Sequence, residues 1–343
     1  SLPVLHLDSM MARPPERPCC CLRALVVLAW VPVQGVRLAP RPGRHLPEQP
    51  VVNVARATGS ACATHVPEVG FFREKWEGFR RKEPEDLDEK LQRPDVGLAD
   101  RAAKRSGSSP ALVVGVMSKG GCADLPFRDV IRETWMNQRG VCTLSSSGPR
   151  AGCLVYVTFV VGREGGGADE EDLTVLDYAD DGWSCIARKV RGWFQHAAER
   201  YSWATHVAKM DMDAFPHMAD LLSRMHGLAN PCENVYGGRP WVSPPNEYSP
   251  PEGCRMPVKD NFMKYHDDWN STCWSYMQGA FYLMSRTLAE KVSQPGGWYH
   301  READRCAPED MTAGHAVHKY AREANTCVTA LKFHATKTYW HNP

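Results

Sequence analysis

Short, largely apolar runs alternate along the middle of the chain with segments that have helical periodicity. Three runs are typical of strands buried on both faces of a sheet: Ala111–Met117, Leu154–Gly162 and Trp203–Val207. Apolar residues three and four positions apart predict amphipathic helices over Asp124–Trp135 and Trp183–Ala198. The alternation predicts an α/β fold of Rossmann-like type, with a mostly parallel sheet covered by helices on both faces.

The pattern is less regular in the second half of the chain, where the elements are shorter. Gly279 interrupts an aromatic segment there, which is typical of a strand that another group approaches closely. The further predicted elements are the start of a helix at Glu170–Leu176, a strand ending at Val235–Gly238, an aromatic strand over Trp274–Ser285, helices over Arg286–Val292 and Glu309–Tyr320, and a strand ending at Lys332–Ala335.

The N-terminal third divides into two regions by composition. In residues 1–36, three arginines precede the apolar run Ala24–Val36, which is shorter than the roughly 20 residues that span a bilayer. This region is predicted to be a cytosolic tail with a signal peptide or a short signal anchor. Residues 37–106 are predicted to be a stem, in which the charged segment Phe71–Gln92 has the spacing of a stem helix. Residues 107–343 form the main domain.

Composition narrows the class of protein and its compartment. A net charge of +1 without a basic stripe excludes electrostatic binding of nucleic acid. Of 13 cysteines, three precede the first apolar run, and the even set from Cys62 to Cys327 fits an oxidising lumen. No C-x-x-C pair is present, which argues against a structural zinc cluster. Asn270-Ser271-Thr272 is an acceptor for N-glycosylation in such a compartment.

Two acids at the exit of a predicted strand are the first candidates for chemistry. Asp211 and Asp213 stand two residues apart, and carboxylates suit Mg²⁺ or Mn²⁺. Ligands of open α/β sheets bind beyond the carboxyl ends of the strands, which is where this pair falls. A lone D-x-D pattern is equally typical of a solvated acidic turn, so the pair needs further motifs before it indicates a metal site.

Four motifs in order along the chain supply that context. They are Arg128–Trp135 (RDVIRETW), Lys209–Phe215 (KMDMDAF), Tyr276–Arg286 (YMQGAFYLMSR) and Glu309–Gly314 (EDMTAG). Together they resemble the motifs of inverting, nucleotide-sugar-dependent β-1,3-glycosyltransferases. More narrowly, they are similar to the trypanosomatid members that depend on UDP-galactose or UDP-N-acetylglucosamine. The resemblance implies a GT-A-type fold, with residues 107–343 as its catalytic domain.

The resemblance also assigns roles to particular residues. A metal would be bound by Asp213 directly, with Asp211 in support and His334 completing its shell; His341 is the alternative histidine. Asp310 would be the general base and Glu309 would orient a neighbouring group, although two acids at a helix N-terminus are also favoured by the helix dipole alone. The residues expected to bind the donor are Arg128, Arg132, Lys209, Asp211 and Gly279.

The two arginines have a second interpretation. Arg128 and Arg132 lie four apart and therefore on one helical face. They suit phosphate or uracil oxygens, or equally an ion-pair network with Asp129 or Glu133. Met212 is a departure from the family, many of whose members have three consecutive acids at this place.

The predicted function is transfer of galactose or N-acetylglucosamine from a UDP-sugar to a hydroxyl of a glycan or glycoprotein, with Mn²⁺ or Mg²⁺ as cofactor. The enzyme would be a single-pass type II protein of the Golgi membrane, with its catalytic domain in the lumen. One rival hypothesis is a degenerate, non-catalytic relative that acts as a lumenal binding protein. Another is a D-x-D phosphohydrolase, which Phe215 disfavours because it occupies the place of the expected Thr or Val.

Overall fold

A computed structural model describes residues 67–82, 111–121, 124–145, 148–163, 170–180, 185–227, 232–241, 246–252, 254, 262–264, 273–333 and 338–341. The predicted anchor, most of the predicted stem, the sequon at Asn270 and the predicted metal ligand His334 lie outside these residues. Among the described helices, none combines the length and apolar composition that crossing a bilayer requires.

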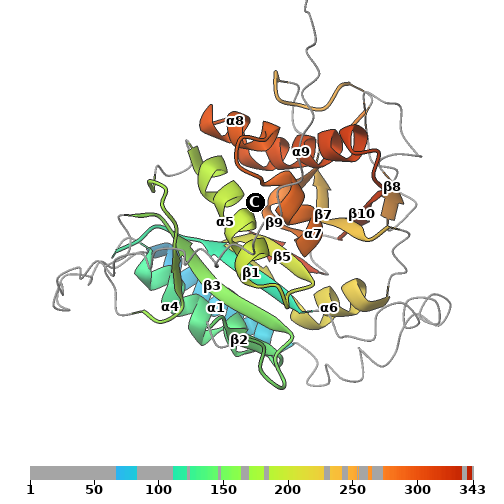
Figure 1. Cartoon of the computed structure of the whole chain (residues 1–343). Helices are drawn as coiled ribbons and strands as arrows, with labels where there is room; N and C mark the ends of the chain where they lie inside the picture. Colours follow the sequence, from blue (N-terminus) through green and yellow to red (C-terminus); the bar gives the residue numbers. More distant parts are fainter. Residues whose placement is uncertain are drawn as a thin grey trace, which may run out of the picture. The chain divides into compact units, whose positions relative to one another are not determined.

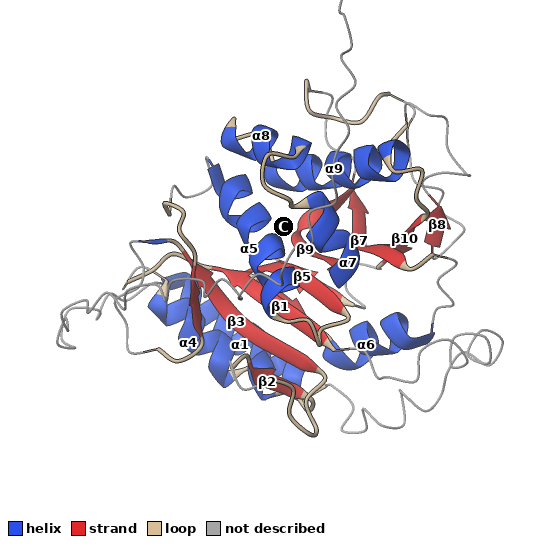
Figure 2. Cartoon of the chain, viewed as in Figure 1, coloured by secondary structure: helices blue, strands red, loops and turns tan. Residues whose placement is uncertain are grey.

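Within the described residues, a sheet of nine strands forms the centre of the fold (Figure 2). Its strands run in the order β2-β3-β1-β5-β9-β7-β10-β8, and β4 pairs with β3. Pairing is parallel from β2 to β5, while β9 is antiparallel to both of its neighbours. The bounds are β1 (Leu112–Met117), β2 (Val141–Thr143), β3 (Val155–Val161), β4 (Leu173–Val175), β5 (His206–Asp211), β7 (Asn234–Trp241), β8 (Phe262–Lys264), β9 (Tyr276–Ser285) and β10 (Val328–Lys332).

Helices cover both faces of this sheet, as the alternation of elements predicts (Figures 1 and 2). One apolar core lies between the sheet and α5, α7, α8 and α9, and a second lies between the opposite face and α1, α4 and α6. The α/β prediction is therefore confirmed. The bounds are α1 (Pro67–Arg80), α4 (Leu125–Glu133), the 3₁₀ turn η1 (Trp135–Asn137), α5 (Ile186–Arg200), α6 (Met218–Gly227), α7 (Arg286–Val292), α8 (Trp298–Asp304) and α9 (Glu309–Glu323).

Three sequence predictions of local structure are wrong. The strand predicted to end at Val235–Gly238 continues to Trp241, which pairs with Tyr276 of β9. Glu170–Leu176 does not begin a helix, because Leu173–Val175 pairs with the end of β3 as strand β4. The third buried strand does not end at Val207 but continues to Asp211, since every residue from His206 to Asp211 pairs with β1. Lys209 and Asp211 are therefore strand residues, and only Asp213 lies in the turn that follows.

A small second sheet follows β5 directly. Strand β6 (Ala214–Pro216) pairs in antiparallel fashion with β11 (Tyr339–His341), so that His341 lies opposite Ala214. The sequence pattern does not predict this pair, because each strand is three residues long. We call the two strands the β6–β11 ribbon.

Disulfides tie distant parts of the domain together. The eight cysteines that the structure describes are all paired, as Cys142–Cys153, Cys185–Cys306, Cys232–Cys327 and Cys254–Cys273. The Cys185–Cys306 bond connects the start of α5 to the turn just before α9. This pairing agrees with the oxidising compartment that the cysteine content indicates.

Close packing of α5 on β1 generates a prediction about stability. A Cβ on Gly115 would lie 2.3–2.7 Å from three atoms of the Trp193 indole, whose N–H donates to the Ala208 carbonyl at 2.9 Å. Gly115→Ala should therefore lower the free energy of unfolding by about 1–3 kcal/mol through overpacking. Chemical denaturation of the disulfide-intact protein measures this. Gly70→Ala is the control, because open space surrounds that helical position and alanine is favoured there by up to ~1 kcal/mol.

Candidate active site

The alternation of side chains along β5 decides which residues face the site. Ala208 and Met210 point into the core on the α1 and α4 face. Val207 points to the other face, so Lys209 and Asp211 do as well. Helix α9 covers that face and begins with Glu309 and Asp310. Two motifs far apart in sequence therefore meet here.

The ammonium group of Lys209 joins the two motifs. Its Nζ lies 2.7 Å from Asp211 Oδ1 and 3.2 Å from Glu309 Oε2, and it also donates to the carbonyl of Gly279. Lys209 is fully buried, while Asp211 and Glu309 are nearly so. A buried lysine needs such partners, because an unpaired charge in the interior is strongly unfavourable.

The pKa values in this group follow from one cation facing several acids. Burial alone would lower the pKa of Lys209, but Asp211 and Glu309 raise it above the ordinary value, so the lysine is charged. Burial raises the pKa of Glu309 to about 7; Lys209 opposes the rise, while Asp310 and Asp211 add to it. The pKa values of Lys209 and Glu309 can both be raised, because one ammonium faces three carboxylates and cannot neutralise all of them.

Glu309 and Asp310 are in different surroundings although they are neighbours. Glu309 is buried and accepts a hydrogen bond from the Tyr282 hydroxyl as well as contacting Lys209. Asp310 is only half-buried, and its Oδ1 accepts from the N–H of Met311 at 2.8 Å. A Cβ on Gly279 would lie 3.5 Å from Asp310 Oδ2 and from Glu309 Oε2, at ordinary van der Waals distance, so β9 passes close to both acids. Asp310 is the more exposed of the two acids.

A second group of ligand-forming side chains lies at the end of β5. Asp211, Asp213 and His341 each offer one ligand atom, and these atoms all lie within 4.8 Å of one another. His341 Nε2 is 3.3 Å from Asp213 Oδ2, and this hydrogen bond raises the pKa of the imidazole. Two carboxylates and an imidazole suit Mn²⁺ and, less well, Mg²⁺. The residues present therefore fit a divalent cation, with His341 in the group.

Met212 has different surroundings from the acids on either side. Its side chain packs against the apolar core on the α1 and α4 face. The ligand group consists of its neighbours Asp211 and Asp213 together with His341. The position that departs from the family pattern therefore contributes to the core.

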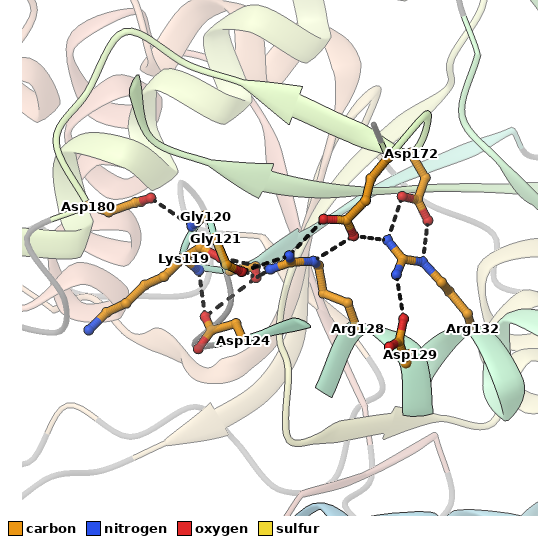
Figure 3. Close-up of polar contacts among 11 residues, drawn as sticks. Lys119, Gly120, Gly121, Asp124, Arg128, Asp129, Arg132, Asp172 and Asp180 are labelled. Atoms are coloured by element: carbon orange, nitrogen blue, oxygen red, sulfur yellow. Dashed lines mark hydrogen bonds and ion pairs between the residues drawn. The ribbon is translucent and has the colours of Figure 1, made fainter. Parts of the chain in front are cut away.

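The loop after β1 lies at the same edge of the sheet, because Met117 at the end of β1 pairs with Asp211 at the end of β5. Arg128 is fully buried beneath this loop and donates to the carbonyls of Lys119 and Gly121 at 2.8 and 3.1 Å (Figure 3). It also pairs with Glu170 at 2.8 Å. Arg128 thus holds the loop from below.

Arg132 lies one turn further along α4, in an ion-pair network. Its guanidinium contacts Asp172 at 2.7 Å and Asp129 at 2.8 Å, and it also pairs with Glu170 (Figure 3). The pair with Asp129 is one that the sequence suggested, whereas Glu133 pairs with Arg73 of α1 instead. Direct contact of Arg128 or Arg132 with a nucleotide stays a prediction.

Sequence reasoning missed a second charged group that shapes the same loop. Asp180 accepts from the N–H of Gly120 at 3.1 Å (Figure 3). It also accepts from the N–H of Gly162 at 2.9 Å. Lys189 of α5 pairs with Asp180 at 2.6 Å and donates to the Ser118 carbonyl at 2.7 Å. The sequence signal for this group was Lys189, a charged residue on the buried face of the predicted helix. The ends of β1 and β3 are thereby fixed to each other.

The buried lysine generates a prediction about stability. Lys209→Met removes the cation shared by the acids and should cost about 3–5 kcal/mol, because their charges are left buried and unpaired. Protonation of the acids removes the unpaired charges. The stability lost in Lys209→Met should therefore shrink as pH falls from 8 to 5, because in this range the folded variant binds more protons than the unfolded chain. Urea denaturation across this range measures the effect. Lys291→Met on α7, at an exposed position, should change stability by less than about 0.5 kcal/mol.

Comparison with known proteins adds a family to this geometry. The family model described as Galactosyltransferase matches residues 127–325, which is more than half of the chain. The match includes α4 from its third residue, the acids at the end of β5 and the start of α9, but it ends before His341. A search of curated proteins found no match. On the family model and the α/β architecture together, the chain belongs to the galactosyltransferase family.

Proposed function

We propose that this glycosyltransferase is an inverting enzyme that moves galactose or N-acetylglucosamine from a UDP-sugar to a hydroxyl of a glycan or glycoprotein, forming a β-1,3 linkage. The observation that carries the proposal is the position of Lys209 Nζ between Asp211 at 2.7 Å and Glu309 at 3.2 Å. Through this ammonium, the acids suited to a metal and the acids suited to proton transfer belong to one site.

The donor end of the site consists of Asp211, Asp213 and His341, which would hold Mn²⁺ or Mg²⁺. A metal held there would supply positive charge to stabilise the diphosphate of the leaving UDP. The loop after β1 would receive the nucleotide, since it begins beside Asp211 at the carboxyl edge of the sheet. Arg128 and Asp180 would act by holding this loop in shape.

The acceptor end depends on Asp310. As the acceptor hydroxyl attacks the anomeric carbon, the carboxylate of Asp310 takes its proton, and the bond from that carbon to the UDP oxygen breaks with its electron pair leaving on UDP. Attack opposite the leaving group inverts the anomeric centre. Glu309 would orient Lys209 rather than react, because Tyr282 and Lys209 already occupy its carboxylate.

We also propose a lumenal, Golgi-type location with a single-pass type II anchor in residues 1–36. Four disulfides within the described residues support an oxidising compartment. The anchor itself rests on the sequence pattern of basic residues before an apolar run.

The first prediction concerns the metal. Asp213→Ala should abolish Mn²⁺-dependent binding of UDP and leave the fold intact, because Asp213 is only half-buried in a turn. Calorimetric titration of UDP with and without Mn²⁺ measures this, with circular dichroism to verify the fold. Glu323→Ala, which removes an exposed acid at the end of α9, is the matched control and should bind as wild type. Folded wild-type chain that binds no UDP would instead support a non-catalytic relative.

The second prediction concerns the base. Asp310→Asn should retain UDP-sugar binding but lose transfer by about 10²–10⁴-fold, since the amide cannot take a proton. Radiolabelled transfer to a panel of glycan acceptors measures this. Glu309→Gln is the comparison: it removes a partner of Lys209 and should lower the melting temperature, whereas Asp310→Asn should change it little. Turnover near the wild-type rate in Asp310→Asn would rule out Asp310 as the base.

A further inference from the structure

Helix α1 lies in the segment that the sequence assigns to the stem, yet it packs on the catalytic domain. Phe72 and Trp76 are buried in the core that α4 and α6 share. Figure 1 shows α1 next to α4. The ring of Phe72 lies 5.8 Å from that of Phe127 on α4, and Arg73 pairs with Glu133 at the other end of α4. The helix is therefore anchored on the same face of the sheet as α4.

The same helix contacts both strands of the β6–β11 ribbon. Phe79 has its ring centroid 5.2 Å from that of Phe215 in β6 and 5.5 Å from that of Trp340 in β11. Trp76 approaches Phe215 at 6.2 Å, and Lys75 Nζ lies 5.2 Å from the centre of the Trp340 ring. One helical face thus holds an aromatic residue from each strand.

Those two aromatic residues are close in sequence to the candidate metal ligands. Phe215 follows Asp213 by two positions, and Trp340 immediately precedes His341. Phe215 and Trp340 also pair directly across the ribbon. Any shift of one strand against the other would therefore change the separation of Asp213 and His341, whose ligand atoms are 3.3 Å apart.

The ribbon is too small to keep this geometry alone. Each strand has three residues, and isolated two-stranded pairs are marginally stable in water. Other contacts also support it: the Tyr339 hydroxyl donates to Gln278 of β9 at 3.0 Å, and Gln138 donates to the Pro216 carbonyl at 2.9 Å. Helix α1 is thus one of several elements that pack against the ribbon, and it is the one that contacts the aromatic residue of each strand.

We propose that α1 is a positioning element of the metal site: Phe79 and Lys75 hold the β6–β11 ribbon in the register that brings Asp213 and His341 together. The inference rests on the proposed function, because it presupposes that this group binds a divalent cation. It gives the segment Pro67–Arg80 a part in the chemistry, beyond that of a spacer between membrane and enzyme.

The first test measures metal affinity in a variant of α1. Phe79→Ala removes the ring between Phe215 and Trp340 and should weaken Mn²⁺ binding about tenfold, the lower end of the loss when groups behind metal ligands are removed. Mn²⁺ is titrated by calorimetry into the full chain with saturating UDP, at a temperature where circular dichroism shows the variant folded. Phe79→Tyr keeps the ring and should restore wild-type affinity. Phe71→Ala, on the exposed side of the same helix, is the matched control and should bind as wild type.

The second test uses the unaltered chain, so it does not depend on a variant that folds. Coupling is reciprocal: if α1 strengthens metal binding, then metal must strengthen the docking of α1. Hydrogen exchange of the amides of residues 71–80 should therefore slow on addition of Mn²⁺ and UDP, relative to UDP alone.

The outcomes separate the two levels of the argument. Unchanged exchange in α1, or wild-type Mn²⁺ affinity in folded Phe79→Ala, overturns the positioning role and leaves the proposed function standing. Absence of Mn²⁺ binding in the wild-type chain overturns the proposed function and this inference with it.

Discussion

The buried ammonium of Lys209 is the interaction on which the candidate active site depends. A lysine at the middle of a sheet must be paired, and the nearest acids available to it lie on its own strand and at the start of α9. Satisfying the charge therefore fixes α9 against β9, where the absence of a side chain at Gly314 also lets the helix approach Tyr276 closely. The buried charge of Lys209 and the close packing at Gly314 together place Asp310 beside the end of β5.

Charge balance then accounts for what the site is able to bind. Asp211, Asp213, Glu309 and Asp310 supply four carboxylates around one lysine within the group, with His341 next to Asp213. Burial raises the pKa of Glu309 to about 7, and like-charge repulsion from Asp310 and Asp211 adds to the rise. A divalent cation bound by Asp211, Asp213 and His341 would relieve the repulsion at the more exposed end. The charges of the acids therefore support the proposed metal site.

The fold could be predicted from sequence to the extent that its elements are buried on both faces. Strands β1 and β3 are continuous apolar runs, which is the pattern of strands buried on both faces. Asp211 and Asp213 could be singled out because they are acids that follow the third apolar run. Strand β4 could not be recognised, since three residues carry no periodicity and its place depends on the edge of β3. The link from Lys209 to Glu309 spans 100 residues and becomes visible only when β5 and α9 are in contact.

The places of His341 and of helix α1 were the hardest to predict, because both depend on contacts between segments far apart in the sequence. His341 joins Asp213 through the pairing of two very short strands, and the resemblance to known enzymes favoured His334, which lies outside the described residues. Helix α1 has four aromatic residues on a charged background, and three of them, Phe72, Trp76 and Phe79, pack against the domain. Their spacing of four and three is that of one helical face, but nothing in the sequence says which surface that face covers. The boundary drawn at residue 106 by composition therefore separates residues that the structure brings into one core.

The same geometry bears on whether Met212 marks a degenerate enzyme. Beyond the end of β5, Asp211 and Asp213 lie with His341, while the residue between them packs toward the core that α1 and α4 cover. An acid at that position would have to leave the core or be buried there, and a methionine fills the space with flexible apolar contact. Methionine therefore replaces the middle acid of the family pattern at a position whose side chain packs on the core and not in the ligand group. Substitution of either outer acid would remove a candidate ligand atom, whereas this one leaves both of them in place.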